Sequence, residues 1–133
     1  GLQALGGEVV ATELLPDGVE LLAGRLRALA AAGVRLCLCT GGTGLGPRDL
    51  APEALQSLGA RRVDGLAQML RALSAQHTPM AWLSRAEVVQ LDGMLVFALP
   101  GSPRAAAQCL DILAPVLGHA LAMAGGAGHG SAA

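Results

Sequence analysis

Aromatic residues are almost missing from this sequence of 133 residues, and lysine is entirely missing. It has one tryptophan, one phenylalanine and no tyrosine, so its core must be built from leucine, valine, alanine and methionine. All nine basic residues are arginines spread along the chain, and the formal net charge is −1. Because a nucleic-acid surface needs clustered positive charge, this distribution argues against a nucleic-acid partner. The length is that of one domain.

Metal-binding and membrane patterns are lacking as well. Cys37 and Cys39 lie two apart in a predicted strand, where their side chains share a face, and this spacing differs from the CxxC of metal sites. No histidine has a second His or Cys at ligand spacing. We interpret the cysteines, with Cys109, as buried thiols of a reducing compartment, and expect a cytoplasmic protein. Charges, glycines and prolines interrupt every long apolar run, so no membrane partner is expected.

Hydrophobic periodicity predicts an alternation of strands and helices. The predicted elements are a strand at 7–15, a helix at 16–33, a strand at 34–40, helices at 51–59 and 63–76, a hairpin at 86–100 and a helix at 102–124, within which Pro115 can end one helix or open the next. The continuous apolar strand after a helix indicates a parallel sheet covered on both faces. We therefore predict an α/β fold, a three-layer open, mostly parallel sheet with helices on both faces. Residues 1–124 are expected to form the domain and 125–133 a disordered tail.

Two loops are rich in glycine and follow predicted strands. The first, "TGGTGLGPRDL", covers residues 40–50, and the second, "PGSPR", covers residues 100–104 and opens onto a helix. Ligands of open α/β folds bind beyond the carboxyl ends of strands, and backbone N–H groups at such loops attract anions. The first loop matches neither the Walker motif nor the dinucleotide fingerprint. We expect the two loops to hold one phosphorylated ligand from two sides.

Four blocks of the sequence carry a resemblance to a known family. They are "LLPD" at 14–17, "TGGTGLGPRDLAPEAL" at 40–55, "HTPMAWLSRA" at 77–86 and "LPGSPRAAAQCLDILAPVLGHAL" at 99–121. In this order they resemble the MogA and MoaB type of molybdopterin-binding protein, the family that includes the G domain of gephyrin. The resemblance implies a molybdopterin-binding fold and a place in molybdenum cofactor synthesis.

The activity that the resemblance implies is transfer of AMP from ATP to the terminal phosphate of molybdopterin. Pyrophosphate is released and Mg²⁺ is required. The implied partners are molybdopterin, ATP and a downstream metal-insertion protein, and the implied assembly is a homotrimer or higher homo-oligomer.

The resemblance also implies the site residues. The acids Asp17 and Asp49 correspond to essential family acids; we expect Asp49 to bind Mg²⁺, since carboxylates hold this ion beside nucleotide phosphates. Asp17 is expected to join the same metal shell or to orient the pterin. The expected substrate-binding residues are Thr40, Gly41, Gly42, Thr43, Gly44, Arg48, Ser84, Gly101, Ser102 and Pro103.

Several of these residues have a purely structural interpretation. Asp17 precedes a predicted helix, where it could be an N-cap. Arg48 could pair with Asp49 across a surface loop, although we favour phosphate neutralisation. Ser102 could cap the last helix, which is compatible with phosphate binding because both use the same N–H groups.

The chain departs from the family pattern at several places. Ala51 stands where the pattern has a threonine, Asp64 where it has a proline and Gln68 where it has an acid. The sequence begins at the end of the family's first helix, so we expect a chain that lacks the first strand, a fragment or a piece of a fusion. These departures keep two other functions open: a non-catalytic molybdopterin-binding relative in the same pathway, and a related domain for metal insertion or nucleotide hydrolysis.

Overall fold

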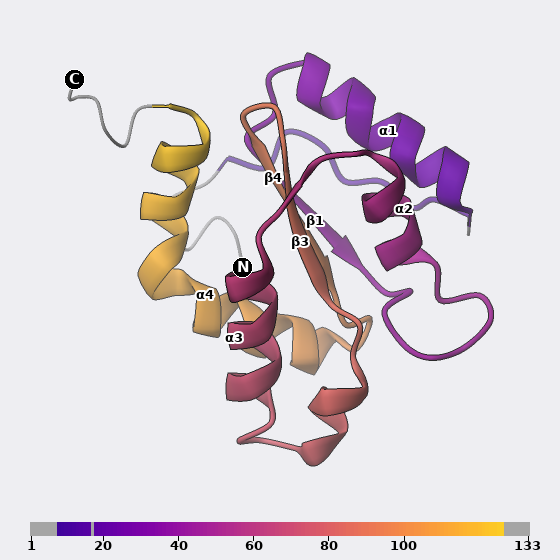
Figure 1. Ribbon diagram of the computed structural model, residues 1–133, viewed down its shortest axis with the longest axis vertical. Helices are drawn as coiled ribbons and strands as arrows, with labels where there is room; N and C mark the ends of the chain where they lie inside the picture. Colours follow the sequence, from indigo (N-terminus) through magenta and orange to yellow (C-terminus); the bar gives the residue numbers. More distant parts are fainter. Residues whose placement is uncertain (1–7, 17, 127–133) are drawn as a thin grey trace.

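The computed structural model describes residues 8–16 and 18–126 and has three layers. Its elements are α1 (Val19–Ala31), β1 (Leu36–Thr40), α2 (Ala51–Ser57), β2 (Arg61–Arg62), α3 (Asp64–Ser74), the 3₁₀ helix η2 (Pro79–Leu83), β3 (Glu87–Leu91), β4 (Met94–Leu99) and α4 (Pro103–Ala124). Helices α1 and α2 cover one face of the sheet, and α3 and α4 cover the other (Figure 1). The predicted α/β fold with helices on both faces is confirmed.

The sheet has the strand order β1-β4-β3-β2. Strands β1 and β4 are parallel, with Leu36 opposite Leu95 and Thr40 opposite Leu99. Strands β3 and β4 are antiparallel because a short turn joins them. Strand β2 is also antiparallel to β3. The described sheet is therefore mixed, and its parallel pairing is confined to β1 and β4.

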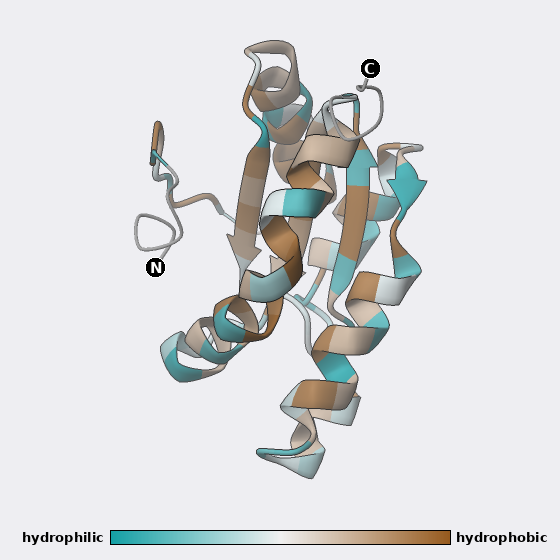
Figure 2. Ribbon diagram, turned by 90° about the vertical axis from the view of Figure 1, so that its left-hand side faces the viewer, coloured by the Kyte–Doolittle hydropathy of each residue, from teal (hydrophilic) through white to brown (hydrophobic). Residues whose placement is uncertain are grey.

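Strand β4 lies between β1 and β3, and its side chains alternate between two cores. Leu95, Phe97 and Leu99 pack against α3 and α4, whereas Val96 and Ala98 pack against α1 and α2. All six residues of β4 are buried, as expected for a strand covered on both sides. In Figure 2 the strands are coloured mostly brown, for hydrophobic residues, whereas the helices carry both brown and teal residues.

The strand predicted at 7–15 is wrong for its described residues, since 8–15 contain no strand. Val10 and Leu14 are 68% and 99% exposed. An apolar alternation becomes a strand only where a neighbour offers backbone hydrogen bonds, and this segment pairs with none of the described strands.

The other predicted elements are confirmed within a few residues at their ends. Pro115 does not divide the last helix: α4 is one helix of 22 residues whose axis changes direction part-way, as Figure 1 shows. By length and apolar composition alone α4 could cross a membrane, a test that the core helix of a globular protein also passes. Here it packs on the sheet, with Cys109, Leu113 and Leu117 in the core. The predicted tail lies outside the described residues from 127 onward.

Candidate functional site

The two glycine loops meet at the carboxyl ends of the parallel strands. The N–H of Gly41, just after β1, donates to the carbonyl oxygen of Leu99 at the end of β4, at 2.9 Å. A Cβ atom on Gly101 would lie 3.2 Å from the Cα of Gly41, so backbone touches backbone here. The juxtaposition predicted from the sequence follows from the parallel pairing of β1 with β4.

The first loop presents a run of free amide groups. Gly41 and Gly42 have φ values of 95° and 72°, which side chains disfavour. Among the described residues, the N–H groups of Gly42, Thr43, Gly44 and Leu45 meet no hydrogen-bond acceptor. Successive unpaired N–H groups form a concave anion site. The loop therefore has the backbone chemistry expected of a phosphate cradle.

A cleft of about 630 Å³ opens beside these amides. Both glycine loops, α3, η2 and the start of α4 contribute to its walls. Most of its surface is apolar, and the charged residues in its described lining are Asp49 and Arg71. Its lining consists of Gly41, Gly42, Thr43, Gly44, Leu45, Asp49, Leu70, Arg71, Ser74, Thr78, Met80, Ala81, Leu83, Ser84, Ala86, Pro100, Gly101, Ala105, Gln108 and Cys109. A flat, partly apolar ligand that carries an anionic group suits such walls.

Asp49 folds back onto the glycine loop while remaining at the cleft. Its Oδ2 accepts a hydrogen bond from the N–H of Gly46 at 2.9 Å. A Cβ on Gly44 or on Gly46 would lie 2.8 Å from this oxygen, so both glycines make room for the carboxylate. Asp49 thus closes the loop, and the described structure shows no pairing with the neighbouring Arg48.

The predicted site residues divide into those that line the cleft and those that do not. Thr40 is an exposed residue at the end of β1, and Arg48 is exposed as well. Ser102 caps α4, since its Oγ accepts the N–H of Ala105 at 3.4 Å, and Pro103 is the first helical residue. Asp17 lies outside the described residues, and α1 has Gly18 at its N-cap. The lining residues among the predicted ones are Gly41, Gly42, Thr43, Gly44, Asp49, Ser84 and Gly101.

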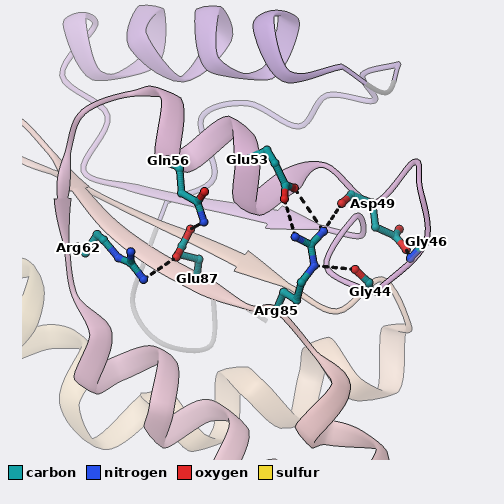
Figure 3. Close-up of polar contacts among 8 residues, drawn as sticks. All are labelled: Gly44, Gly46, Asp49, Glu53, Gln56, Arg62, Arg85 and Glu87. Carbon is teal, nitrogen blue, oxygen red and sulfur yellow. Dashed lines mark hydrogen bonds and ion pairs between the residues drawn. The ribbon is translucent and has the colours of Figure 1, made fainter.

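Sequence reasoning missed Arg85 and Glu53, which lie behind the loop (Figure 3). Arg85 Nη1 is 2.5 Å from Glu53 Oε2, and its Nε donates to the carbonyl oxygen of Gly44 at 2.9 Å. The hydrogen bond that Arg85 donates to Glu53 lowers the pKa of the Glu53 carboxyl below its usual value. The positive charge of Arg85 lowers that pKa further. Arg85 stands beside Ser84 in the block "LSR", so adjacency to a predicted site residue was the available signal.

A magnesium ion would have few protein ligands here. In the described part of the chain, no three His, Cys, Asp or Glu side chains gather into a metal site. Mg²⁺ in phosphoryl-transfer sites commonly takes one or two carboxylates and completes its shell with water and substrate phosphates. Asp49 fits that role, because one hydrogen bond leaves much of the acceptor capacity of its carboxylate unused.

A family model for a "Probable molybdopterin binding domain" matches residues 1–119. The chain belongs to this molybdopterin-binding family. The molybdenum cofactor biosynthesis bifunctional protein of Synechococcus elongatus is 47% identical over 115 residues, covering 86% of this chain and 36% of that protein. The molybdopterin adenylyltransferase of Haemophilus influenzae is 35% identical over 101 residues, covering 75% of this chain and 51% of that protein.

Solved structures of the family have the same fold. The MoaB structure from Thermus thermophilus is 42% identical, with a TM-score of 0.85 over 94% of this chain and 82% of its own. A MogA structure is 32% identical, with a TM-score of 0.86 over 92% and 81%. The molybdopterin-binding domain described here spans less than half the length of its bifunctional relatives. Family membership assigns it to molybdenum cofactor biosynthesis.

The three departures from the family pattern are not themselves part of the cleft lining, although Ala51 contacts it from behind. Ala51, the first residue of α2, is buried in the core, and its N–H donates to the carbonyl oxygen of Gly42 at 3.1 Å. Gln68 is exposed on α3, and Asp64 pairs with Arg62 at 3.2 Å. None of the three substituted residues lines the cleft.

Proposed function

We propose that this domain transfers AMP from Mg-ATP to the terminal phosphate of molybdopterin. The observation that carries the proposal is the row of free N–H groups at Gly42–Leu45 beside the Asp49 carboxylate, in one cleft with apolar walls. The relative from Haemophilus influenzae named molybdopterin adenylyltransferase supports this reaction. The cytoplasmic location and the trimer remain predictions.

The reaction joins two heavily charged groups. An oxygen of the molybdopterin phosphate forms a bond to the α-phosphorus of ATP, while the bond from that phosphorus to the oxygen bridging to the β-phosphate breaks. Pyrophosphate leaves with that bridging oxygen. Catalysis of such a transfer consists mainly of positioning and charge neutralisation, both of which fixed backbone dipoles provide.

The domain's own residues have separate tasks in this scheme. The amides of the first loop hold an anionic oxygen, and the contact of Gly41 with Gly101 keeps the second loop beside them. The apolar walls formed by Leu70, Met80 and Leu83 accept a flat ring and exclude water from it. Mg²⁺, when bound, would neutralise charge on the nucleotide phosphates, and Asp49 is the residue that would hold it.

A binding-only function is the second candidate. Among the residues that the structure describes, Asp49 is the only acid in the cleft lining, and its Oδ2 already accepts a hydrogen bond from Gly46. A domain that only binds molybdopterin needs the amide row and the apolar walls, but it needs no carboxylate for a metal.

Molybdopterin-dependent release of pyrophosphate from Mg-ATP separates the two functions. We expect release by the wild-type protein and a loss of about 10²-fold or more in kcat for Asp49→Asn, which keeps the side-chain shape but removes the charge. Asp111→Asn, an exposed change on α4, serves as the matched control and should retain full activity. Wild-type protein that binds molybdopterin but releases no pyrophosphate would establish the binding-only function.

A further inference from the structure

Arg85 holds three carbonyl groups of the glycine loop. Its backbone N–H donates to the carbonyl oxygen of Thr43 at 2.7 Å, and its Nε donates to that of Gly44 at 2.9 Å. Its Nη2 donates to the carbonyl oxygen of Asp49. One residue just before β3 therefore contacts both ends of the loop segment 43–49, as Figure 3 shows for the side-chain contacts.

These contacts fix the direction in which the loop amides point. In a trans peptide unit the C=O of one residue and the N–H of the next point in opposite directions. Because the carbonyls of Thr43 and Gly44 face Arg85, the N–H groups of Gly44 and Leu45 point away from it. Gly44 and Leu45 line the cleft and Arg85 does not, so those N–H groups are directed to the cleft side.

Glu53 in turn fixes the guanidinium of Arg85. Its two carboxylate oxygens lie 2.5 Å from Nη1 and 3.3 Å from Nη2 of Arg85, a two-point contact from helix α2. The Arg85 and Glu53 side chains are 34% and 39% exposed, so the pair alone adds little stability. The geometry of the pair matters more. The planar guanidinium of arginine donates to several acceptors at once, and the ammonium group of lysine cannot donate in the same directions.

We infer that Arg85, held by Glu53, is a positioning residue that keeps the Gly44 and Leu45 N–H groups of the glycine loop turned toward the phosphate of the ligand. The ligand's identity rests on the proposed function, whereas the orientation of the loop does not. Arg85 is not among the residues that line the cleft. Its effect on binding passes entirely through the peptide planes that it holds.

The experiment compares Arg85→Lys and Arg85→Ala with Arg62→Lys as the matched control. Arg62 likewise pairs with a glutamate, Glu87, at 3.3 Å, but contacts no loop carbonyl. Three quantities are measured for each protein: the unfolding midpoint in urea, hydrogen exchange of the hydrogen-bonded loop amides of Gly41, Gly46 and Asp49 without ligand, and the Kd for molybdopterin. Methylguanidinium is then added to Arg85→Ala, with methylammonium at equal concentration as its control. A cavity of about 280 Å³ borders Arg85 and gives the added ion access.

For Arg85→Lys we expect faster exchange confined to the glycine loop and a Kd about ten- to a hundredfold weaker, as for the loss of one or two charge-assisted hydrogen bonds. The midpoint should stay near that of the wild type, and Arg62→Lys should change none of the three quantities. Methylguanidinium, but not methylammonium, should restore binding and slow exchange in Arg85→Ala.

Unchanged loop exchange in both Arg85 variants would overturn the inference. So would faster exchange throughout the protein with a matching fall in midpoint and no rescue, because that pattern indicates a general structural role. If the wild type binds molybdopterin but releases no pyrophosphate, the proposed reaction fails while these readouts still decide the role of Arg85. If the wild type binds no molybdopterin, the ligand assignment fails, and loop exchange with methylguanidinium rescue still decides the orientation claim.

Discussion

At the scale of single residues, the glycine loop has carbonyl groups that accept hydrogen bonds and N–H groups that meet no acceptor among the described residues. Arg85 donates hydrogen bonds to three carbonyl oxygens of the loop, and Asp49 accepts one from the N–H of Gly46. The remaining donors face a cleft that also contains the Asp49 carboxylate. Two carboxylates thus have different tasks, since Glu53 fixes the arginine behind the loop and Asp49 lies at its front.

The ion pair of Glu53 predicts an acid-dependent loss of stability. Because its pKa is lowered in the folded state, mainly by the hydrogen bond from Arg85, the stabilisation is fully present above the unfolded-state pKa of about 4.3. It is lost as the pH falls from there through the lower, folded-state value. Urea midpoints measured from pH 6 to 3 should therefore fall less for Glu53→Gln than for the wild type.

The matched control for this prediction is Glu20→Gln, an exposed change in the first turn of α1. It should follow the wild-type curve. Parallel pH curves for the wild type and Glu53→Gln would show that the pair contributes no pH-dependent stability.

At the scale of elements, the site depends on two loops whose backbones touch. The parallel neighbours β1 and β4 bring their carboxyl ends together, and each continues into a glycine-bearing loop. The gap between Gly41 and Gly101 has no room for a methyl group without movement. The close approach of the two loops therefore favours glycine at 101.

Gly101→Ala should separate the loops by a few tenths of an ångström and weaken molybdopterin binding several-fold. The strain should cost about 1 kcal/mol of stability, because loop backbone yields more easily than a packed core. The control is Gly24→Ala on α1, where a Cβ meets no atom within 4 Å. This change should raise stability by about 0.5–1 kcal/mol and leave binding unchanged. Unaltered affinity in Gly101→Ala would mean that the ligand does not depend on the spacing of the loops.

At the scale of the whole molecule, β4 and the two cores beside it carry the fold. Phe97 is fully buried among residues of α3, α4 and β3, although the chain has only two aromatic residues. The other one, Trp82 in η2, is 61% exposed. One aromatic side chain therefore belongs to the core and the other to the surface.

Phe97→Ala should cost about 3–5 kcal/mol of unfolding free energy, since it removes a large side chain from the middle of the sheet and leaves a cavity. This is a large part of the 5–15 kcal/mol that a domain of this size typically has. Trp82→Ala should cost about 1 kcal/mol or less. Urea unfolding followed by circular dichroism measures both without relying on tryptophan fluorescence. Equal losses in the two variants would contradict this division between core and surface.

Much of this architecture could be predicted from sequence patterns because those patterns are local. The apolar spacing of α1 and α3, the continuous apolar strand β1 and the turn between β3 and β4 each lie within a few residues. The segment 8–15 shows the limit of such reasoning, since its alternation resembles a strand but none of the described strands pairs with it. Strand β2 has two residues and no periodicity to detect.

The sequence by itself determined the helices, the central strands and the two glycine loops, since turn residues and hydrophobic period act at short range. Only the tertiary structure decided that Arg85 and Glu53, 32 residues apart, meet behind the glycine loop. Contacts of this kind depend on how the sheet brings distant segments together. The direction of the loop amides was settled at the same level, because no local pattern states which carbonyls a distant arginine will hold.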